Sequence, residues 1–149
     1  MAATLSNEVH SKGVQSNPVQ SLEALSRHAH WLLRFALASV FVYSGIDKFM
    51  GGGIAEFAGV MQLPEFIAAL VALAEIGGGL LVLLGAVISP WVTRLGALMV
   101  VPVMLGAIVM VHWGQWHFVP TATHPLGGMM FQVTLLLIAI YLFIRGNDV

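Results

Sequence analysis

The sequence predicts an all-α integral membrane protein, a four-helix bundle with a short interfacial helix in the loop between its first and second spans. Hydrophobic residues make up 58% of the 149 residues and charged residues only 9%, whereas about a quarter of a soluble domain is charged. The mean hydropathy is +0.90. The 24 residues of Phe66–Ser89 contain no proline and one ionisable side chain, Glu75. A helix of that length crosses a hydrocarbon core of about 30 Å.

Composition also limits the chemistry of the chain. The net charge of −1 gives no reason to expect a nucleic acid partner. The absence of cysteine excludes disulfides, thiolate metal sites, iron–sulfur clusters and thiol redox chemistry by the chain itself. If the protein belongs to a redox system, the electrons travel on the cofactor of a partner or on a bound lipid-soluble carrier.

The chain divides into a tail and a membrane domain. Residues 1–26 are polar and carry no signal-peptide pattern, so we expect a flexible cytoplasmic tail, with a helix near Ser21. Residues 27–149 form the membrane domain, with spans predicted at about residues 31–49, 66–89, 94–113 and 128–144.

The connections have signals of their own. Between Met50 and Pro64, apolar residues recur at helical spacing, which predicts a short amphipathic helix lying on the membrane. A Ser89-Pro90-Trp91 turn precedes the third span, which Pro102 should kink.

Basic residues predict the orientation. Four arginines fall at the ends of spans on the side of the termini, and one lysine falls on the other side: Arg27, Arg34, Arg94 and Arg145 against Lys48. The positive-inside rule therefore predicts a multi-pass protein of the bacterial inner membrane, surrounded by lipid, with both termini cytoplasmic.

Glu75 is the first candidate site residue, because an unpaired carboxylate near the middle of a span costs at least a few kcal/mol. Ala74 and Gly77–Gly79 lie beside it and allow a neighbouring backbone to approach closely. Arg34, Ala38, Phe41, Gly45 and Lys48 share one face of the first span. Counted from the predicted helix ends, Arg34 and Glu75 differ in depth by about 6 Å, so we expect them to pair.

Two interpretations of that pair remain open. It is either a structural link between two helices or the polar floor of a pocket that opens past Lys48 and His112 and holds a quinone head group or a small anion. The alternative for Lys48 is that it only extends to the water interface.

A metal site is not expected. His112, His117 and His124 are separated by five and seven residues, without an accompanying carboxylate, and this spacing matches no helical ligand pair. The histidines of the loop at residues 113–127 are assigned no role.

Three segments resemble the DoxX family of small four-helix membrane proteins. FVYSGIDKF contains the family's phenylalanine–x–x–x–glycine–x–x–lysine pattern, AEFAGVMQLP resembles its loop helix, and LAEIGGGLLVLLG resembles its second helix. The resemblance covers roughly residues 31–145. It implies a subunit of a membrane redox or detoxification complex, with family polar positions at Arg34, Lys48, Glu75 and, less directly, His112.

Three functions follow as hypotheses. The first is the membrane subunit of a quinone-linked redox or detoxification system, non-catalytic itself or quinone-binding, with a protein partner. The second is a small transporter or channel that uses Arg34, Glu75 and Lys48 as a polar track. The third is a non-catalytic membrane scaffold that binds a partner through residues 1–26 and the loops. The sequence leaves the catalytic residues, the substrate and the number of copies in an oligomer open.

Overall fold

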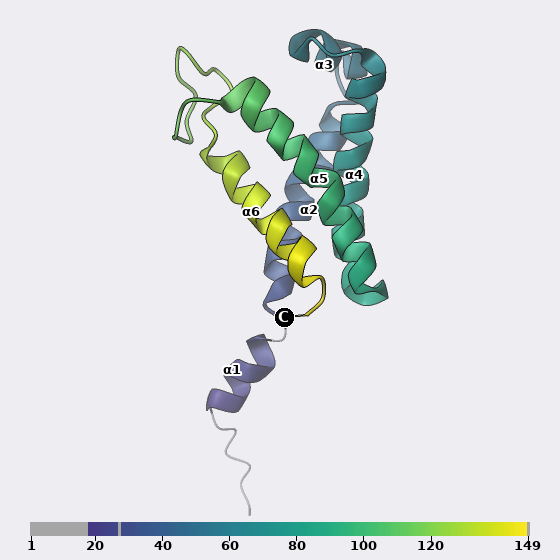
Figure 1. Cartoon of the computed structure of the whole chain (residues 1–149), viewed down its shortest axis with the longest axis vertical. Helices are drawn as coiled ribbons and strands as arrows, with labels where there is room; N and C mark the ends of the chain where they lie inside the picture. Colours follow the sequence, from purple (N-terminus) through teal and green to yellow (C-terminus); the bar gives the residue numbers. More distant parts are fainter. Residues whose placement is uncertain (1–17, 27, 149) are drawn as a thin grey trace, which may run out of the picture.

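The computed structural model describes residues 18–26 and 28–148 (Figure 1). These residues form six α-helices and one π-helical turn, without a strand among them. In chain order the elements are α1 (Pro18–Ser26), α2 (His30–Asp47), α3 (Gly53–Met61), α4 (Glu65–Ile88), α5 (Pro90–Ala107), the π-helix η1 (Ile108–His112) and α6 (Met130–Arg145). The predicted all-α fold is confirmed.

The third long helix differs most from its predicted bounds. It was expected to begin near Arg94, but α5 begins at Pro90. Proline is favoured in the first turn of a helix because its missing N–H has no partner there in any case. Ser89 caps the same end, and its hydroxyl accepts a hydrogen bond from the Trp91 N–H at 3.4 Å. The turn residues therefore start the helix instead of preceding it.

Two of the described helices are long and apolar enough to cross a membrane: Glu65–Ile88, and the continuous helix Pro90–His112 formed by α5 and η1. Within the most apolar 18 residues of each helix, only 33% is buried inside the protein. The remaining side chains include exposed Leu73, Leu84 and Val87, so the outer surface of these helices is apolar. Helix α6 is also apolar but shorter.

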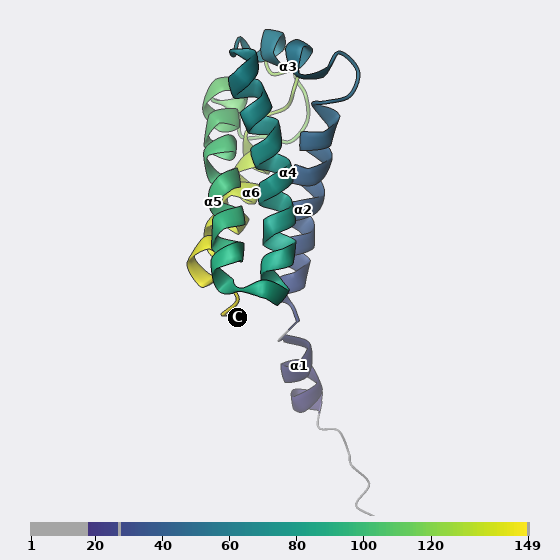
Figure 2. The ribbon, with the colours of Figure 1, turned by 90° about the vertical axis from the view of Figure 1, so that its right-hand side faces the viewer.

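Helix α4 packs between α2 and α5, and α6 packs on α5 (Figures 1 and 2). Glycine allows the closest approaches. A Cβ at Gly78 would lie 2.9 Å from the Gly96 carbonyl oxygen, and a Cβ at Gly45 would lie 2.8 Å from that of Ala72. The predicted role of the glycine cluster of α4 in helix packing is confirmed at Gly78 and Gly79, which faces α2.

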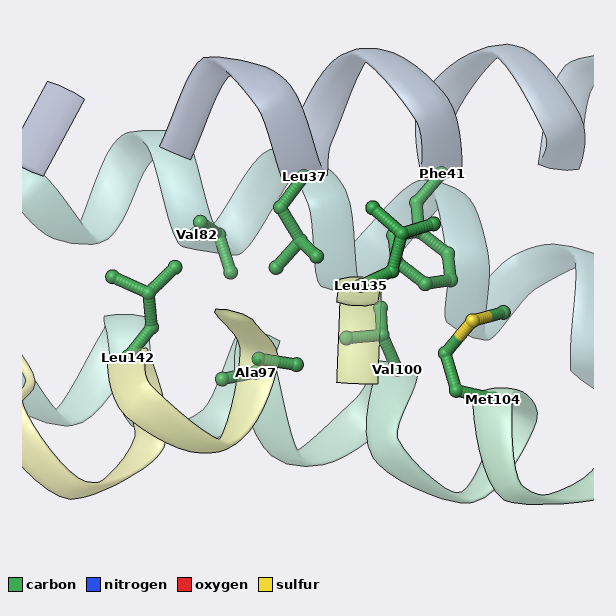
Figure 3. Packing of buried hydrophobic residues seen from close by; sticks show 9 residues of the cluster. Leu37, Phe41, Val82, Ala97, Val100, Met104, Leu135 and Leu142 are labelled. Atoms are coloured by element: carbon green, nitrogen blue, oxygen red, sulfur yellow. The ribbon is translucent and has the colours of Figure 1, made fainter. Parts of the chain in front are cut away.

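The core fills the middle of the bundle. Its buried side chains come from α2, α4, α5 and α6, and Figure 3 shows them packed together. Leu37 and Phe41 extend from α2 toward Val82 on α4 and Val100 on α5. This apolar layer separates the polar groups near the start of α2 and the end of α6 from those near α3.

The connecting segments follow the sequence pattern. Helix α3 lies at the end of the bundle (Figure 2), with Ala58 buried and Glu56 exposed, which confirms the predicted loop helix. Residues 1–17 of the predicted tail lie outside the described residues, as does Arg27 at the start of the predicted membrane domain. Residues 18–26, the rest of the tail, form α1, with Leu22 and Leu25 exposed.

Candidate functional site

An ion pair joins the end of α2 to the middle of α4. Lys48 Nζ lies 2.6 Å from Glu75 Oε2. The same ammonium donates to Ser44 Oγ at 2.8 Å and to the Ser44 carbonyl oxygen at 3.3 Å. It also lies 4.9 Å from the centre of the Phe57 ring on α3, within the range of a cation–π interaction. The polar groups of α2 and α4 therefore meet beneath α3.

The local sequence explains how this pair forms. Lys48 follows Ser44 by four residues, so both side chains lie on one face of α2. Gly45 lets this face approach α4 at Ala72, one turn before Glu75. The Lys48 and Glu75 side chains are 15% and 5% exposed. A pair this far from water interacts more strongly than a surface pair.

The predicted pair of Arg34 and Glu75 is wrong, because the two residues lie at different levels of the bundle. Ala38 lies opposite Gly79 and Gly45 opposite Ala72. This register places Arg34 level with Val82, whose carbonyl oxygen it binds at 2.6 Å. Val82 is seven residues beyond Glu75, which is about 10 Å along a helix.

Arg34 instead links four segments near the start of α2 and the end of α6. One guanidinium nitrogen, Nη1, donates to the Val82 carbonyl and to Thr93 Oγ1 at 2.7 Å. The other, Nη2, donates to the Gly146 carbonyl at 2.8 Å and to Asn147 Oδ1 at 2.7 Å. The side chain is fully buried. All of these acceptors are neutral, so the arrangement fits a structural link between helices.

His112 forms a second polar pair, with Gln132 of α6. It ends η1 and is 8% exposed. Its Nδ1 lies 2.8 Å from the Gly127 carbonyl oxygen, and its Nε2 lies 2.9 Å from Gln132 Nε2 on α6. The π turn follows Pro102 on the same continuous helix, and such turns occur frequently at functional sites.

Both polar pairs line one cavity of about 280 Å³. Its walls come from α2, α3, α4, α5, η1 and α6, and its lining is otherwise mainly apolar. The structure thus brings Lys48, Glu75 and His112 to one cavity and leaves Arg34 outside it. The sequence prediction did not include Gln132 in the site. The sequence did indicate Gln132 as a candidate, because it is the only strongly polar side chain of the last predicted span.

The other histidines of the loop after η1 hold the loop together. His117 Nε2 contacts Gln115 Oε1, and His124 Nε2 lies 2.7 Å from the Trp113 carbonyl oxygen. Among the described residues, no three histidine, cysteine or acidic side chains are grouped so that they could hold a metal ion.

An all-α fold with two helices long and apolar enough to cross a membrane, and a mainly apolar cavity, is typical of a small membrane protein. The family model of DoxX matches residues 29–113, and the chain belongs to the DoxX family. It is 31% identical, over 117 residues and 78% of the length of each chain, to a Bacillus subtilis (strain 168) protein named "Putative oxidoreductase CatD". No solved structure shows significant similarity to the chain.

The family match confirms the resemblance seen in the sequence. It includes α2, α3, α4 and α5 together with η1, and hence Arg34, Lys48, Glu75 and His112. Helix α6 lies beyond the matched residues, so Gln132 belongs to a part of the cavity that the family model does not include.

Proposed function

We propose that this protein is the quinone-binding membrane subunit of an oxidoreductase, with four spans, and that the cavity between Lys48–Glu75 and His112–Gln132 holds the quinone ring. The observation that carries the proposal is the cavity itself, which is mainly apolar with two polar pairs on its walls. Ligand sites in proteins commonly combine an apolar lining with a few placed polar groups. The relative named as an oxidoreductase supports a redox role.

The proposed spans are α2, α4, α5 with η1, and α6. The Arg34 side chain, the Arg94 side chain and the end of α6 lie together, since Arg34 binds Gly146 and Arg94 Nη2 lies 3.4 Å from the Ile144 carbonyl oxygen. These arginines mark the cytoplasmic side by the positive-inside rule. The cavity, α3 and the loop after η1 then lie in the outer half of the bacterial inner membrane.

The residues at the cavity fit a quinone ring. A bound quinone would supply the redox chemistry, because it exchanges two electrons and two protons between its dione and dihydroxy forms. Phe41, Val103 and Leu135 offer apolar walls, and Glu75 and Gln132 offer polar contacts from opposite helices. Lys48 holds the Glu75 carboxylate in place, and Gly127 fixes the orientation of the His112 ring.

The apolar core favours this function over transport. A polar track through the bundle would have to connect Arg34 to Lys48 and Glu75. Leu37 and Phe41 lie between Arg34 and Lys48 on α2, and both are packed into the core. In the described part of the chain, Arg34 shares no hydrogen-bond partner with the Lys48–Glu75 pair. Binding at one end of the bundle fits this arrangement better than flux along it.

The test is a variant that fills the cavity without disturbing the helices. Gly106 lines the cavity, and a Cβ there would meet no atom within 4 Å. We expect Gly106→Leu to lower the affinity of the purified protein for a short-chain benzoquinone at least tenfold, measured by calorimetry in mild detergent.

The matched control is Gly59→Leu on α3. A Cβ at this position also meets no atom within 4 Å, and Gly59 does not line the cavity. Its quinone affinity should stay unchanged. A Gly106→Leu protein that binds the quinone as tightly as the parent would refute the proposed site.

A further inference from the structure

The cavity offers hydrogen-bond acceptors but few free donors. Lys48 is the strongest donor beside it, and an ammonium group has three hydrogens. These are taken up by the Ser44 carbonyl, by Ser44 Oγ and by Glu75 Oε2. All three hydrogens of the Lys48 ammonium are therefore directed at partners within the protein.

Glu75 keeps acceptor capacity. A carboxylate has about four lone-pair positions. Lys48 occupies one of them, and about three remain for a donor in the cavity that Glu75 lines.

The opposite wall is also an acceptor, as the tautomer of His112 shows. Because His112 Nδ1 lies 2.8 Å from the Gly127 carbonyl oxygen, Nδ1 carries the proton and donates it. In the neutral ring Nε2 then has a lone pair, which accepts from the Gln132 amide nitrogen at 2.9 Å. The Gln132 amide oxygen points away from this contact. It is buried and has no hydrogen-bond partner among the described residues.

A buried acceptor without a partner costs about 1–3 kcal/mol, and a hydroxyl in the cavity would remove that cost. We propose that the cavity selects the reduced, dihydroxy form of the quinone over the dione, with one hydroxyl donating to Glu75 and the other to Gln132. A dione has no hydrogen to donate to either acceptor. This selection rests on the proposed function, since it assigns the redox form that the same cavity binds.

The experiment compares the two forms on one protein. The purified full chain in mild detergent is titrated, under anaerobic conditions, with decylbenzoquinone and separately with its reduced quinol, and the dissociation constants are measured by calorimetry. We expect the quinol to bind at least tenfold more tightly, the factor that corresponds to about 1.4 kcal/mol. Equal affinities, or tighter binding of the quinone, would overturn the selection while leaving the proposed function in place. If neither form binds, the proposed function fails as well.

A variant tests the role of Gln132. Gln132→Leu removes the amide oxygen at similar volume, and we expect it to weaken quinol binding about tenfold while quinone binding stays the same. The control is Thr134→Val on the same helix, whose hydroxyl donates to the Met130 carbonyl of its own helix and is exposed; it should change neither constant. A quinol preference that survives Gln132→Leu undiminished would show that Gln132 does not select the ligand.

Discussion

Lys48 of α2 and Glu75 of α4 form an ion pair with 2.6 Å between Nζ and Oε2, at the wall of an apolar cavity. The pair has two effects. It joins two helices, and it leaves a carboxylate with free acceptor capacity at a place where a ligand ring fits. Its contribution to stability and its contribution to binding can be separated by substitution.

Glu75→Leu should lower the free energy of unfolding by about 3 kcal/mol, because it leaves the Lys48 ammonium buried without its partner. The double variant Lys48→Met with Glu75→Leu should recover most of that loss, since replacing both members of a buried ion pair by apolar residues is often neutral. Denaturant unfolding in detergent micelles, followed by circular dichroism, measures both values.

The same double variant should not bind the quinol, even though it is stable. Recovery of stability together with recovery of binding would mean that the Glu75 carboxylate does not contact the ligand.

Arg34→Lys should lower the free energy of unfolding by at least about 3 kcal/mol. An ammonium group cannot reproduce the planar fork that contacts four acceptors, and each hydrogen bond to a charged group contributes about 1.5–3 kcal/mol. Arg145→Lys is the matched control, because Arg145 is exposed at the end of α6 and should change stability by less than about 0.5 kcal/mol. Both variants should retain quinone affinity, because the apolar core lies between Arg34 and the cavity. If the two variants are equally stable, Arg34 does not have the structural role assigned to it.

Gly96→Ala should separate α4 from α5 and lower stability by about 1–3 kcal/mol. Its Cβ would lie 2.7 Å from the Gly78 carbonyl oxygen and 2.7 Å from the Val82 backbone nitrogen, which cannot move aside as a flexible side chain does. Gly106→Ala on the same helix meets no atom within 4 Å and should raise stability by up to about 1 kcal/mol. Thermal unfolding compares the two, and opposite signs of the change are the expected result.

Single cysteines should test the proposed orientation without background, because the chain has none of its own. Thr123→Cys in the loop after η1 and Asp148→Cys beyond α6 are both at exposed positions. In intact cells, a maleimide that does not cross membranes should label Thr123→Cys and spare Asp148→Cys until the membrane is opened. Labelling of both from outside would rule out four spans with cytoplasmic termini.

Most of the fold could be predicted from local signals. Runs of apolar residues predicted the four long helices, and helical spacing in Met50–Pro64 predicted α3. Glycines beside Glu75 predicted close helix contacts. The start of α5 was missed because Ser89-Pro90 was interpreted as a turn, although a serine followed by a proline is also a typical beginning of a helix.

The site was predicted in part. Glu75 was chosen because an ionisable group in an apolar helix needs a partner, and Lys48 and His112 were chosen from their positions and the family resemblance. The structure places all three at one cavity. The partner of Glu75 was wrong, because depth counted from predicted helix ends does not give the register of two helices. That register depends on which small residues meet, Ala38 with Gly79 and Gly45 with Ala72. The roles of Gln132 and Gly127 depend on contacts across the loop, which no local pattern specifies.

The contacts of Arg34 have a consequence for biosynthesis. Arg34 precedes its last acceptor, Asn147, by 113 residues, and ribosomes add about 5–20 residues per second. After Arg34 has been synthesised, between about 6 and 23 seconds therefore pass before the last of its acceptors is made. During that interval a nascent α2 would expose a guanidinium that has only water, lipid head groups or the insertion machinery to bind. Closure of the bundle around this side chain therefore has to follow the synthesis of α6.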